Sequence, residues 1–520
     1  MNQLSTEKVL YAILSGVMLT ASFPPGGLDW LAWFALVPLL KSLGNSTPYQ
    51  ALKLGFIAGF THYLTLLYWI ILVLQTYGGL NPIISLGALL LLGLYLALYL
   101  ALFSCFCSYG RKSGFAVLTA AGFWVGLEYI RAKALTGFPW CLLGYTQYRH
   151  LELIQIADLV GVYGISFLIV LVNVLLYTVF FDRDFEKTGL LKWDIVFAVV
   201  IAFLTFTYGQ YCLGKAHERE GKGQPSVKMA IVQGNIDQSM KWHPAYQKKT
   251  LQIYQGLTRS ARVFNPQLVV WPETAVPFFF QDNPELSLRV IRTSRESGAW
   301  LIFGSPAYGR DVDGTKFYNR AYLLSPDGEL TGYYDKVHLV PFGEYVPLKW
   351  FFPFIHRLVQ AAGDFASGEM TAPLNLPSFS AGVLICFEVI FPDLARIRVK
   401  DGAGVLVNLT NDAWFGMTSA PHQHLSMAVF RAVENRRPLI RAANTGISAF
   451  ISPEGKIDIQ GGLFMEEVLT YEVGLCGPLK GFYTQYGDVL PISALGIILI
   501  KILYALCYNS FIFRPLRKKR

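Results

Sequence analysis

The stretch Gly382-Val383-Leu384-Ile385-Cys386-Phe387-Glu388, followed by Val389-Ile390-Phe391-Pro392, decides how this sequence is interpreted. An apolar run typical of a β-strand delivers one cysteine to its end, and a carboxylate and a proline follow at once. A buried strand that ends at such a turn holds its last side chains rigidly at the edge of a sheet, where enzymes often place a nucleophile. Lone cysteines in apolar runs are more often small core residues, so the interpretation depends on the residues that accompany Cys386.

Two upstream fragments share this design. In Leu268-Val-Val-Trp-Pro-Glu273 a glutamate follows an apolar strand, and partial desolvation there would raise its pKa and suit a general base. In Tyr334-Asp-Lys336-Val-His338 a lysine ends a short run, and a fixed ammonium group can stabilise an oxyanion. The alternatives are a turn-capping carboxylate, a solvated lysine and a structural histidine.

A cysteine nucleophile needs a base, because at a thiol pKa of about 8.5 only a small fraction is thiolate near neutral pH. Glu273 is the obvious candidate. The seven cysteines include no CxxC pair, so neither a disulfide framework nor a zinc site is predicted. The sequence also contains no phosphate-cradling glycine loop and no metal-ligand cluster, so we expect no metal and no cofactor.

Composition places much of the chain in a membrane. Of its 520 residues 53% are hydrophobic and only 15% are charged, and the mean hydropathy is +0.39, which points to several membrane spans. We expect about eight, near Val9–Ser22, Leu28–Leu43, Ala51–Leu74, Pro82–Tyr109, Phe115–Ile130, Val160–Phe181, Trp193–Leu213 and Val489–Tyr508.

The positive charges orient these spans. With the N-terminus in the cytoplasm, the inner segments carry Lys41, Arg111, Lys112, Arg183, Lys187, Lys192 and the tail Arg514–Arg520, whereas the first two outer loops carry no lysine or arginine. The third outer loop, Arg131–Asp158, has three basic residues and runs against the trend. The net charge of +9 is therefore better explained by membrane topology than by nucleic-acid binding.

The polar block between the last two spans then faces outward. It follows the charged linker Lys215–Pro225 and alternates strand-like runs with amphipathic helices, which predicts a layered α/β sandwich. The expected strands are Val227–Gln233, Gln267–Trp271, Trp300–Gly304, Tyr318–Leu324, Ala381–Cys386, Gly404–Asn408 and Ile447–Ile451, and the expected helices are Gln247–Val263, Leu286–Ser297 and His422–Glu434.

Glu273, Lys336 and Cys386, in that order and in those settings, resemble the carbon-nitrogen hydrolase (nitrilase) superfamily. The segments Asn408–Gly416 and Arg441–Ser448 also match its pattern. Together with the multispan half, the chain resembles the bacterial apolipoprotein N-acyltransferases. The resemblance implies a polytopic α-helical membrane domain (1–213), a nitrilase-like αββα sandwich on the outer face (214–487), and a last span with a basic cytoplasmic tail (488–520).

The resemblance also implies a mechanism and a location. Glu273 would be the general base, Cys386 the nucleophile that takes an acyl chain from a phospholipid as a thioester, and Lys336 with the backbone N–H of Phe387 the oxyanion site. The acceptor would be the α-amino group of a diacylglyceryl-apolipoprotein. Glu344 and Glu388 would support the triad, and substrate contacts are expected from Trp242, Asn411, Trp414 and Arg149. The chain is expected to act as a monomer in the bacterial inner membrane, with its catalytic domain in the periplasm.

Several placements stay open at this stage. The apolar loops Pro277–Phe280 and Trp350–Phe354 would either dip into the bilayer interface or be buried. The third outer loop, with Trp140 and Tyr145, could close under the site, and Glu128 and Arg131 would snorkel from a span end. Two other functions are a membrane-tethered nitrilase-type amidase with water as acceptor, and a transporter with an inactive outer domain.

Overall fold

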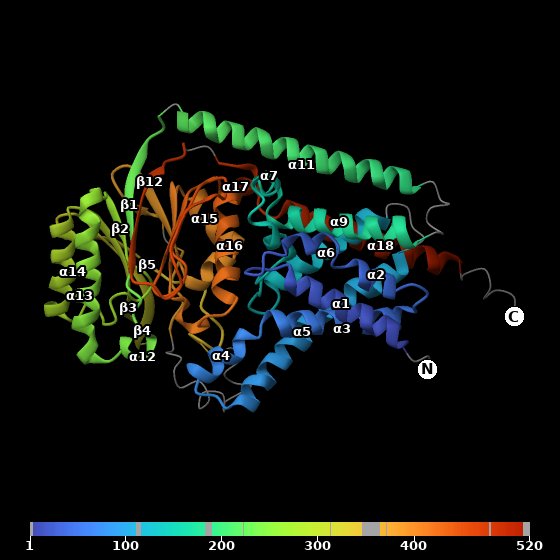
Figure 1. Ribbon diagram of the computed structural model, residues 1–520, viewed down its shortest axis with the longest axis horizontal. Helices are drawn as coiled ribbons and strands as arrows, with labels where there is room; N and C mark the ends of the chain where they lie inside the picture. The colour runs from blue at the N-terminus through green and yellow to red at the C-terminus, as the bar shows by residue number, and fades with distance from the viewer. Residues whose placement is uncertain are drawn as a thin grey trace.

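The computed structural model describes residues 4–110, 116–182, 190–221, 223–311, 314–345, 365–370, 372–477 and 480–512. Strands flanked by helices form one half of the molecule, and a bundle of long helices forms the other (Figure 1). Some residues singled out in the sequence lie outside the described ones, namely Trp350–Phe354, Arg111, Lys112, Arg183, Lys187 and Arg514–Arg520.

The half that holds the strands contains two six-stranded sheets. The first has the order β12 (Glu467–Gly474), β1 (Ser226–Gln233), β2 (Leu268–Val270), β3 (Trp300–Asp311), β4 (Gly314–Leu324) and β5 (Leu330–Asp335). The second has the order β11 (Ile457–Gln460), β10 (Ala449–Ile451), β9 (Leu439–Ala443), β8 (Val405–Thr410), β7 (Ser380–Ile385) and β6 (Leu374–Asn375). Strands β1, β2 and β3 run parallel, as do β7, β8 and β9, and the remaining pairs are antiparallel.

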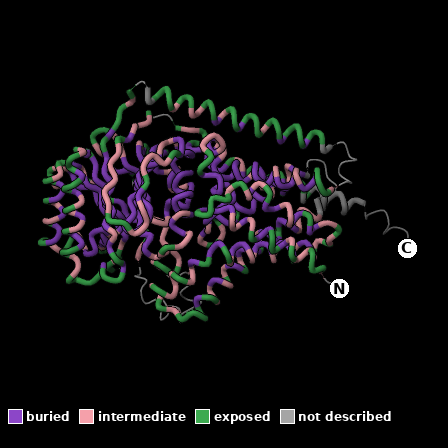
Figure 2. The backbone as a smooth tube through the Cα atoms, viewed as in Figure 1, coloured by how far each residue is buried: buried purple, intermediate pink, exposed green. Residues whose placement is uncertain are grey.

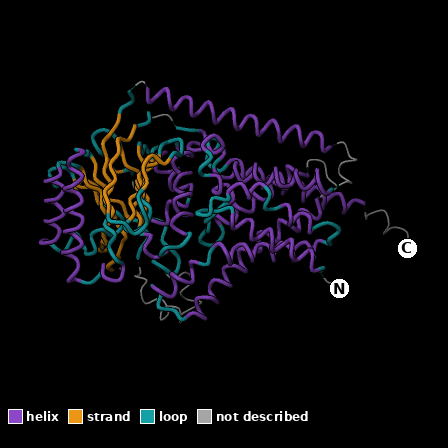
Figure 3. The backbone as a smooth tube through the Cα atoms, in the orientation of Figure 1, coloured by secondary structure: helices purple, strands orange, loops and turns teal. Residues whose placement is uncertain are grey.

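The alternation of side chains along each strand creates the layers. In β1, Met229 and Ile231 pack into the core between the two sheets, whereas Ala230 and Val232 face the opposite way. That outer face is covered by α13 (Pro244–Ala261) and α14 (Pro284–Ser297), and the second sheet is covered by α15 (Pro392–Lys400) and α16 (Ala420–Asn435). The predicted α/β sandwich is confirmed, with two sheets between two helical layers (Figure 3).

All seven predicted strands and all three predicted helices of this half are present, with shifted ends. Five strands were not predicted: β5, β6, β9, β11 and β12. Most of them interrupt the apolar pattern; β9, for example, carries the buried Arg441, and β11 and β12 are only half-buried edge strands. Polar residues at these positions hide the period-2 signal that the prediction depends on.

The other half consists of long apolar helices. They are α1 (Thr6–Ala21), α3 (Pro48–Leu66), α4 (Trp69–Thr76), α5 (Pro82–Gly110), α6 (Ala116–Lys133), α9 (Val162–Phe181), α11 (Leu190–Gly221) and α18 (Val489–Ile512). Among the described residues, three helices are long and apolar enough to cross a membrane, and the α3–α4 pair, bent by 49°, could make a fourth. Membrane-spanning helices are thus supported, but the expected number of eight is not confirmed.

The single helix expected over Leu28–Leu43 is wrong. The chain forms a short 3-10 helix at Asp29–Trp33 and then α2 (Val37–Ser42), which has a proline in its first turn. Asn173 of α9 supports the break: its side-chain amide donates to the Ala32 carbonyl (2.8 Å), and its side-chain oxygen accepts from the Leu36 N–H (2.8 Å). Irregular backbone beside apolar helices is tolerated where protein groups satisfy it, as here.

Helix α11 is the most exposed of the long helices, as the green and pink colouring along its length shows in Figure 2. It continues through Lys215–Gly221 and ends only a few residues before β1, so most of the linker expected over Lys215–Pro225 is helical. Near the half that holds the strands, α11 crosses α7 (Leu151–Ile154) at close range. A Cβ atom at Gly209 would lie only 1.9 Å from the Glu152 carbonyl oxygen. Only glycine allows this crossing.

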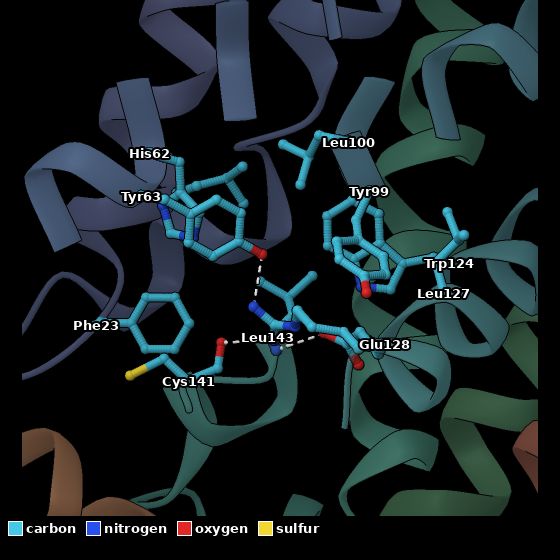
Figure 4. A pocket seen from close by; sticks show the side chains of 12 residues that line it. Phe23, His62, Tyr63, Tyr99, Leu100, Trp124, Leu127, Glu128, Cys141 and Leu143 are labelled. Atoms are coloured by element: carbon cyan, nitrogen blue, oxygen red, sulfur yellow. Dashed lines mark hydrogen bonds between the residues drawn. The ribbon is translucent and has the colours of Figure 1, made fainter. Parts of the chain in front are cut away.

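Glu128 and Arg131 do not snorkel. Both side chains are buried and line a small, mostly apolar cavity between α3, α5 and α6, in which Figure 4 labels Glu128. Arg131 donates to the Tyr63 hydroxyl (2.5 Å) and to the Cys141 carbonyl (3.4 Å), and Glu128 accepts from the Leu143 N–H (2.8 Å). The two side chains therefore hold the loop that follows α6 in place.

The loop after α6 lies against the half of the molecule that contains the strands. The indole N–H of Trp140 donates to the Gln423 side chain (2.8 Å), and the Tyr145 hydroxyl accepts from Arg431 (2.9 Å). Both partners belong to α16. This helix is therefore packed between the second sheet and the membrane half.

Candidate active site

The three predicted catalytic residues follow three different strands. Glu273 lies just after β2, Lys336 directly after β5, and Cys386 directly after β7, where it begins the 3-10 helix η5 (Cys386–Ile390). Strands β2 and β7 are parallel members of their sheets, and the carboxyl ends of parallel strands are where open α/β folds place ligand sites. The fold thus brings to one place side chains that are far apart in sequence.

Cys386 is held in a strained conformation, with φ of 52° in the left-handed region. Non-glycine residues rarely adopt it, and such strain clusters at functional sites. The Asn408 amide supports the turn by donating to the Leu384 carbonyl (3.0 Å) and the Cys386 carbonyl (3.4 Å). Burial raises the pKa of the Cys386 thiol most, and the negative charge of Glu273 raises it further. The positive charge of Lys336 lowers it, and the resulting pKa is about 12. The resting site therefore holds a neutral thiol.

Glu273 uses one carboxylate oxygen for structure. Its Oε1 accepts from the Asn319 amide (2.7 Å) and lies 3.9 Å from the Lys336 ammonium nitrogen. Its Oε2 is buried and has no hydrogen-bond partner among the described residues. Burial raises the pKa of this carboxyl group, and Lys336 opposes that effect. An orphaned, desolvated carboxylate oxygen suits a proton acceptor.

Lys336 is paired more closely with Glu344 than with Glu273. Its ammonium nitrogen lies 2.9 Å from the Glu344 carboxylate, and Glu344 also accepts from the Asn319 amide (3.1 Å) and from the Val340 N–H (2.9 Å). Although burial opposes it, the charges of Glu344 and Glu273 raise the pKa of Lys336, so this lysine is cationic. A fixed cation here can stabilise a developing oxyanion.

Glu388 ties two of these segments together. One carboxylate oxygen accepts from the Tyr334 hydroxyl (2.8 Å), the Val337 N–H (2.7 Å) and the His338 N–H (3.0 Å), and the other accepts from the Ile385 N–H (2.6 Å). It thereby holds the Lys336 segment against the nucleophile turn. Its position predicts support of the site rather than contact with substrate.

A buried ionic network lies behind the nucleophile. Arg441 of β9 donates to Asp412 (2.7 Å) and to the Asn408 side chain (2.5 Å), and Asp412 also lies 3.1 Å from a ring nitrogen of His424. The charges of Arg441 and His424 hold the pKa of Asp412 well below its usual range despite burial. The network links β8, β9 and α16 beneath the turn that carries Cys386.

The expected substrate contacts are spread over the site. Asn411 is buried and donates to the Gln238 side chain (2.7 Å), so it braces a neighbouring loop. Trp414 packs edge-on against Tyr77 of the membrane half, with ring centroids 4.9 Å apart. Arg149 is exposed and donates to the Tyr148 hydroxyl (2.9 Å). The described contacts place neither Trp414 nor Arg149 next to the triad.

Trp242 is 47% exposed and lines a cleft of about 490 Å³. Aromatic and proline side chains dominate this cleft, among them Phe278, Phe279, Phe317 and Phe365. The loop Pro277–Phe280 is mostly buried against the sandwich, which favours the second of the two placements considered for it. The apolar residues of this loop line one wall of the cleft, and the loop follows Glu273 closely in the sequence.

Two polar residues of the site were not predicted. Asn319 lies within β4, where an isolated polar residue in a strand carries no functional signal. Lys241 precedes Trp242, and it is completely buried with its ammonium group 3.2 Å from the Glu273 carbonyl oxygen. Only its position beside Trp242 could have indicated it. His338, in contrast, packs against Phe391 with ring centroids 3.9 Å apart, and burial lowers its pKa to about 4.

Comparisons with known proteins agree with this architecture. A family model described as apolipoprotein N-acyltransferase N-terminal domain matches residues 15–175, and one described as carbon-nitrogen hydrolase matches residues 228–476. A Geobacter metallireducens protein named apolipoprotein N-acyltransferase is 48% identical over 92% of this chain and 92% of its own length. One of the same name from Methylococcus capsulatus is 32% identical over 93% of each chain. A solved Nesterenkonia amidase of the nitrilase superfamily is 21% identical over 50% of this chain and 93% of its own, with a TM-score of 0.38.

Proposed function

The chain belongs to the apolipoprotein N-acyltransferase family, and on that premise we propose that it transfers a fatty acyl chain from a membrane phospholipid to a lipoprotein. The acceptor is the α-amino group of the S-diacylglyceryl-cysteine at the N-terminus of an apolipoprotein. The observation that carries the proposal is the cluster of the partly buried Cys386 with the buried Glu273 and Lys336, in which one Glu273 oxygen is held and the other has no partner among the described residues.

In the first half-reaction Glu273 Oε2 takes the Cys386 proton as the sulfur attacks the ester carbonyl of the phospholipid. The positive charge of Lys336, together with the backbone N–H of Phe387, stabilises the tetrahedral oxyanion. The carbon–oxygen ester bond then breaks, and Glu273 returns the proton to the departing lysophospholipid. An acyl thioester on Cys386 remains.

In the second half-reaction the acceptor amine attacks the thioester carbonyl. Glu273 takes a proton from the amine, the carbon–sulfur bond breaks, and the thiolate of Cys386 is reprotonated. The product is an amide, which forms from a thioester without an added energy source. Because the acyl chain is held on Cys386 between the two half-reactions, the transfer is ping-pong. Support for covalent catalysis comes from the strained, partly buried Cys386, whose thiol is close to a carboxylate and an ammonium group.

The substrates explain the attached membrane half. Both carry acyl chains, so the site has to open at a bilayer rather than into bulk water. We assign residues 1–213 to a membrane domain, residues 214–487 to the catalytic domain and residues 488–520 to a last span with a cytoplasmic tail. The charge distribution supports eight spans in the bacterial inner membrane, both termini inside and the catalytic domain in the periplasm. The protein acts as a monomer, and Trp242, Asn411, Trp414 and Arg149 handle the substrates.

The proposal is tested by intact mass spectrometry after incubation with phospholipid. Wild-type protein is expected to gain one fatty-acyl mass, which hydroxylamine or a diacylglyceryl-cysteine peptide removes, and Cys386→Ser is expected to gain none that hydroxylamine removes. Cys476→Ser is the matched control, because that thiol lies outside the site. No adduct on wild type together with unchanged phospholipid would refute the acyltransfer, and release of free fatty acid without acceptor would favour the amidase.

A further inference from the structure

The active site contains a second buried lysine that the proposed reaction has not yet used. Lys241 ends the short helix α12 (Gln238–Lys241), and its side chain is completely buried. Its ammonium group donates to the backbone carbonyl of Glu273 (3.2 Å). An isolated buried ammonium group is costly, so its retention needs compensating negative charge.

The loop that carries Lys241 is firmly attached to the opposite sheet. The Asn444 side chain, at the end of β9, accepts from the Ile236 N–H (2.9 Å) and donates to the Ile236 carbonyl (2.8 Å). Asn411, after β8, donates to Gln238 (2.7 Å). These bonds join the two sheets across the site, so Lys241 is held at a defined position rather than swinging in from solvent.

A count of charges shows what Lys241 contributes. The site holds three carboxylates, Glu273, Glu344 and Glu388, and with Lys336 alone it would have an excess of two negative charges. With Lys241 included the excess falls to one. When the Cys386 proton moves to Glu273, one negative charge is replaced by another, so the net charge does not change.

We propose that Lys241 is a positioning residue of this active site: its ammonium group fixes the backbone at Glu273 and supplies the second positive charge that lets the Cys386 thiolate form. The role rests on the triad proposed above. Lys241 acts through the backbone carbonyl of Glu273, whereas Lys336 is bound by the Glu344 carboxylate.

The titration of Lys241 supports this role. Burial lowers its pKa to about 8, although Glu273 and Cys386 act to raise it. These two groups, from the segments after β2 and β7, are the charged or titratable groups that face it. Helix α13, packed against α12, contributes Lys248, which is exposed and paired with Glu285. Because the lysine loses its charge as pH rises through about 8, its support of the thiolate is lost over the same range.

The test measures alkylation of Cys386 by iodoacetamide in the full-length protein in detergent, located by peptide mass spectrometry across pH 6–10. Lys241→Met is expected to slow alkylation at pH 7.5 about tenfold or more, as loss of a nearby opposite charge does. The difference from wild type is expected to shrink as pH rises through about 8, where the wild-type lysine loses its charge. Lys241→Arg restores the rate to near the wild-type value. Lys248→Met, which removes an exposed lysine of the same region, leaves the rate unchanged.

Unchanged alkylation in Lys241→Met would overturn the inference, and so would a Lys241→Arg variant as slow as Lys241→Met. If Lys241→Met does not fold, Lys241→Arg still decides, because arginine stays charged: acyl transfer by wild type is expected to fall as pH rises through about 8, and transfer by Lys241→Arg is not. Identical profiles would refute the role. Alkylation needs no lipid, and an unaltered rate in Glu273→Gln would count against the triad itself rather than against Lys241.

Discussion

At the scale of single residues, the two oxygens of Glu273 have different tasks. Asn319 and Lys336 hold one of them, and the other is left unpartnered in a buried site beside the thiol. Asn319 also bonds Glu344, so one amide sets the spacing between both carboxylates and the lysine. The proposed base, held in this way, loses little entropy when it takes a proton.

Acylation of Cys386 is expected to fail on the acid side as Glu273 gains a proton. Burial raises the pKa of this group from its usual value of 4.5, so the rate falls as pH drops through that raised pKa and is fully present only above it. Glu273→Gln removes this acid limb and slows acylation about 10²–10⁴-fold, the usual contribution of a general base. The check is the pH dependence of thioester formation, with Glu329→Gln as the exposed control. An acid limb retained in Glu273→Gln would assign the base elsewhere.

At the scale of elements, the membrane half depends on polar side chains that form hydrogen bonds with the backbone where helices are interrupted. Asn173 of α9 satisfies the backbone between the Asp29–Trp33 turn and α2 from both sides. Glu434 of α16 caps another element, because its carboxylate accepts from the Val162 N–H at the start of α9 (3.1 Å). Each replaces hydrogen bonds that a continuous helix would have supplied internally.

Asn173→Leu is expected to lower the thermal stability of the purified protein. It leaves the Leu36 N–H and the Ala32 carbonyl without these partners, and each buried unpaired group costs about 1–3 kcal/mol. The matched control is Thr178→Val on the same helix, because the Thr178 hydroxyl donates to the Val174 carbonyl one turn away and has no other bond to the described part of the chain. The melting temperature should drop clearly more in Asn173→Leu. An equal, small drop in both would show that the break needs no support from α9.

At the scale of the whole molecule, the two halves are joined by ion pairs of very different burial. Arg436, which follows α16, donates to Asp158 of the membrane half (2.9 Å), and the Tyr208 hydroxyl of α11 donates to the same carboxylate (2.9 Å). Arg219 of α11 and Glu454 make a second link, in which the arginine side chain is 43% exposed. The first link joins three segments and the second joins two.

Arg436→Met is expected to destabilise the protein by about 3–5 kcal/mol, because it leaves a largely buried carboxylate without its cation. Arg219→Met, at the exposed link, is expected to cost less than about 1 kcal/mol. Thermal unfolding in detergent at low and high salt checks both, and only the Arg219 link should weaken noticeably with salt. Similar losses in the two variants would contradict a special role for the buried pair.

The sequence by itself determined the chemistry and the architecture of the catalytic half. Glu273, Lys336 and Cys386 each end an apolar run, and that local pattern is visible without any tertiary contact. The sandwich strands with clear alternation were predicted for the same reason. Membrane helices were indicated by hydropathy, which is also a local property, although it gave neither their number nor their breaks.

Only the tertiary structure decided the features that depend on partners distant in the chain. Lys241 and Asn319 become site residues because α12 and β4 meet the segment after β2, and no local pattern marks either of them. The Leu28–Leu43 helix breaks because Asn173, more than a hundred residues away, satisfies the irregular backbone. β9 stays a strand despite Arg441 because Asp412 and Asn408 neutralise and bond that charge. In each case a buried polar group is stabilised by a partner that only the folded chain brings into contact with it.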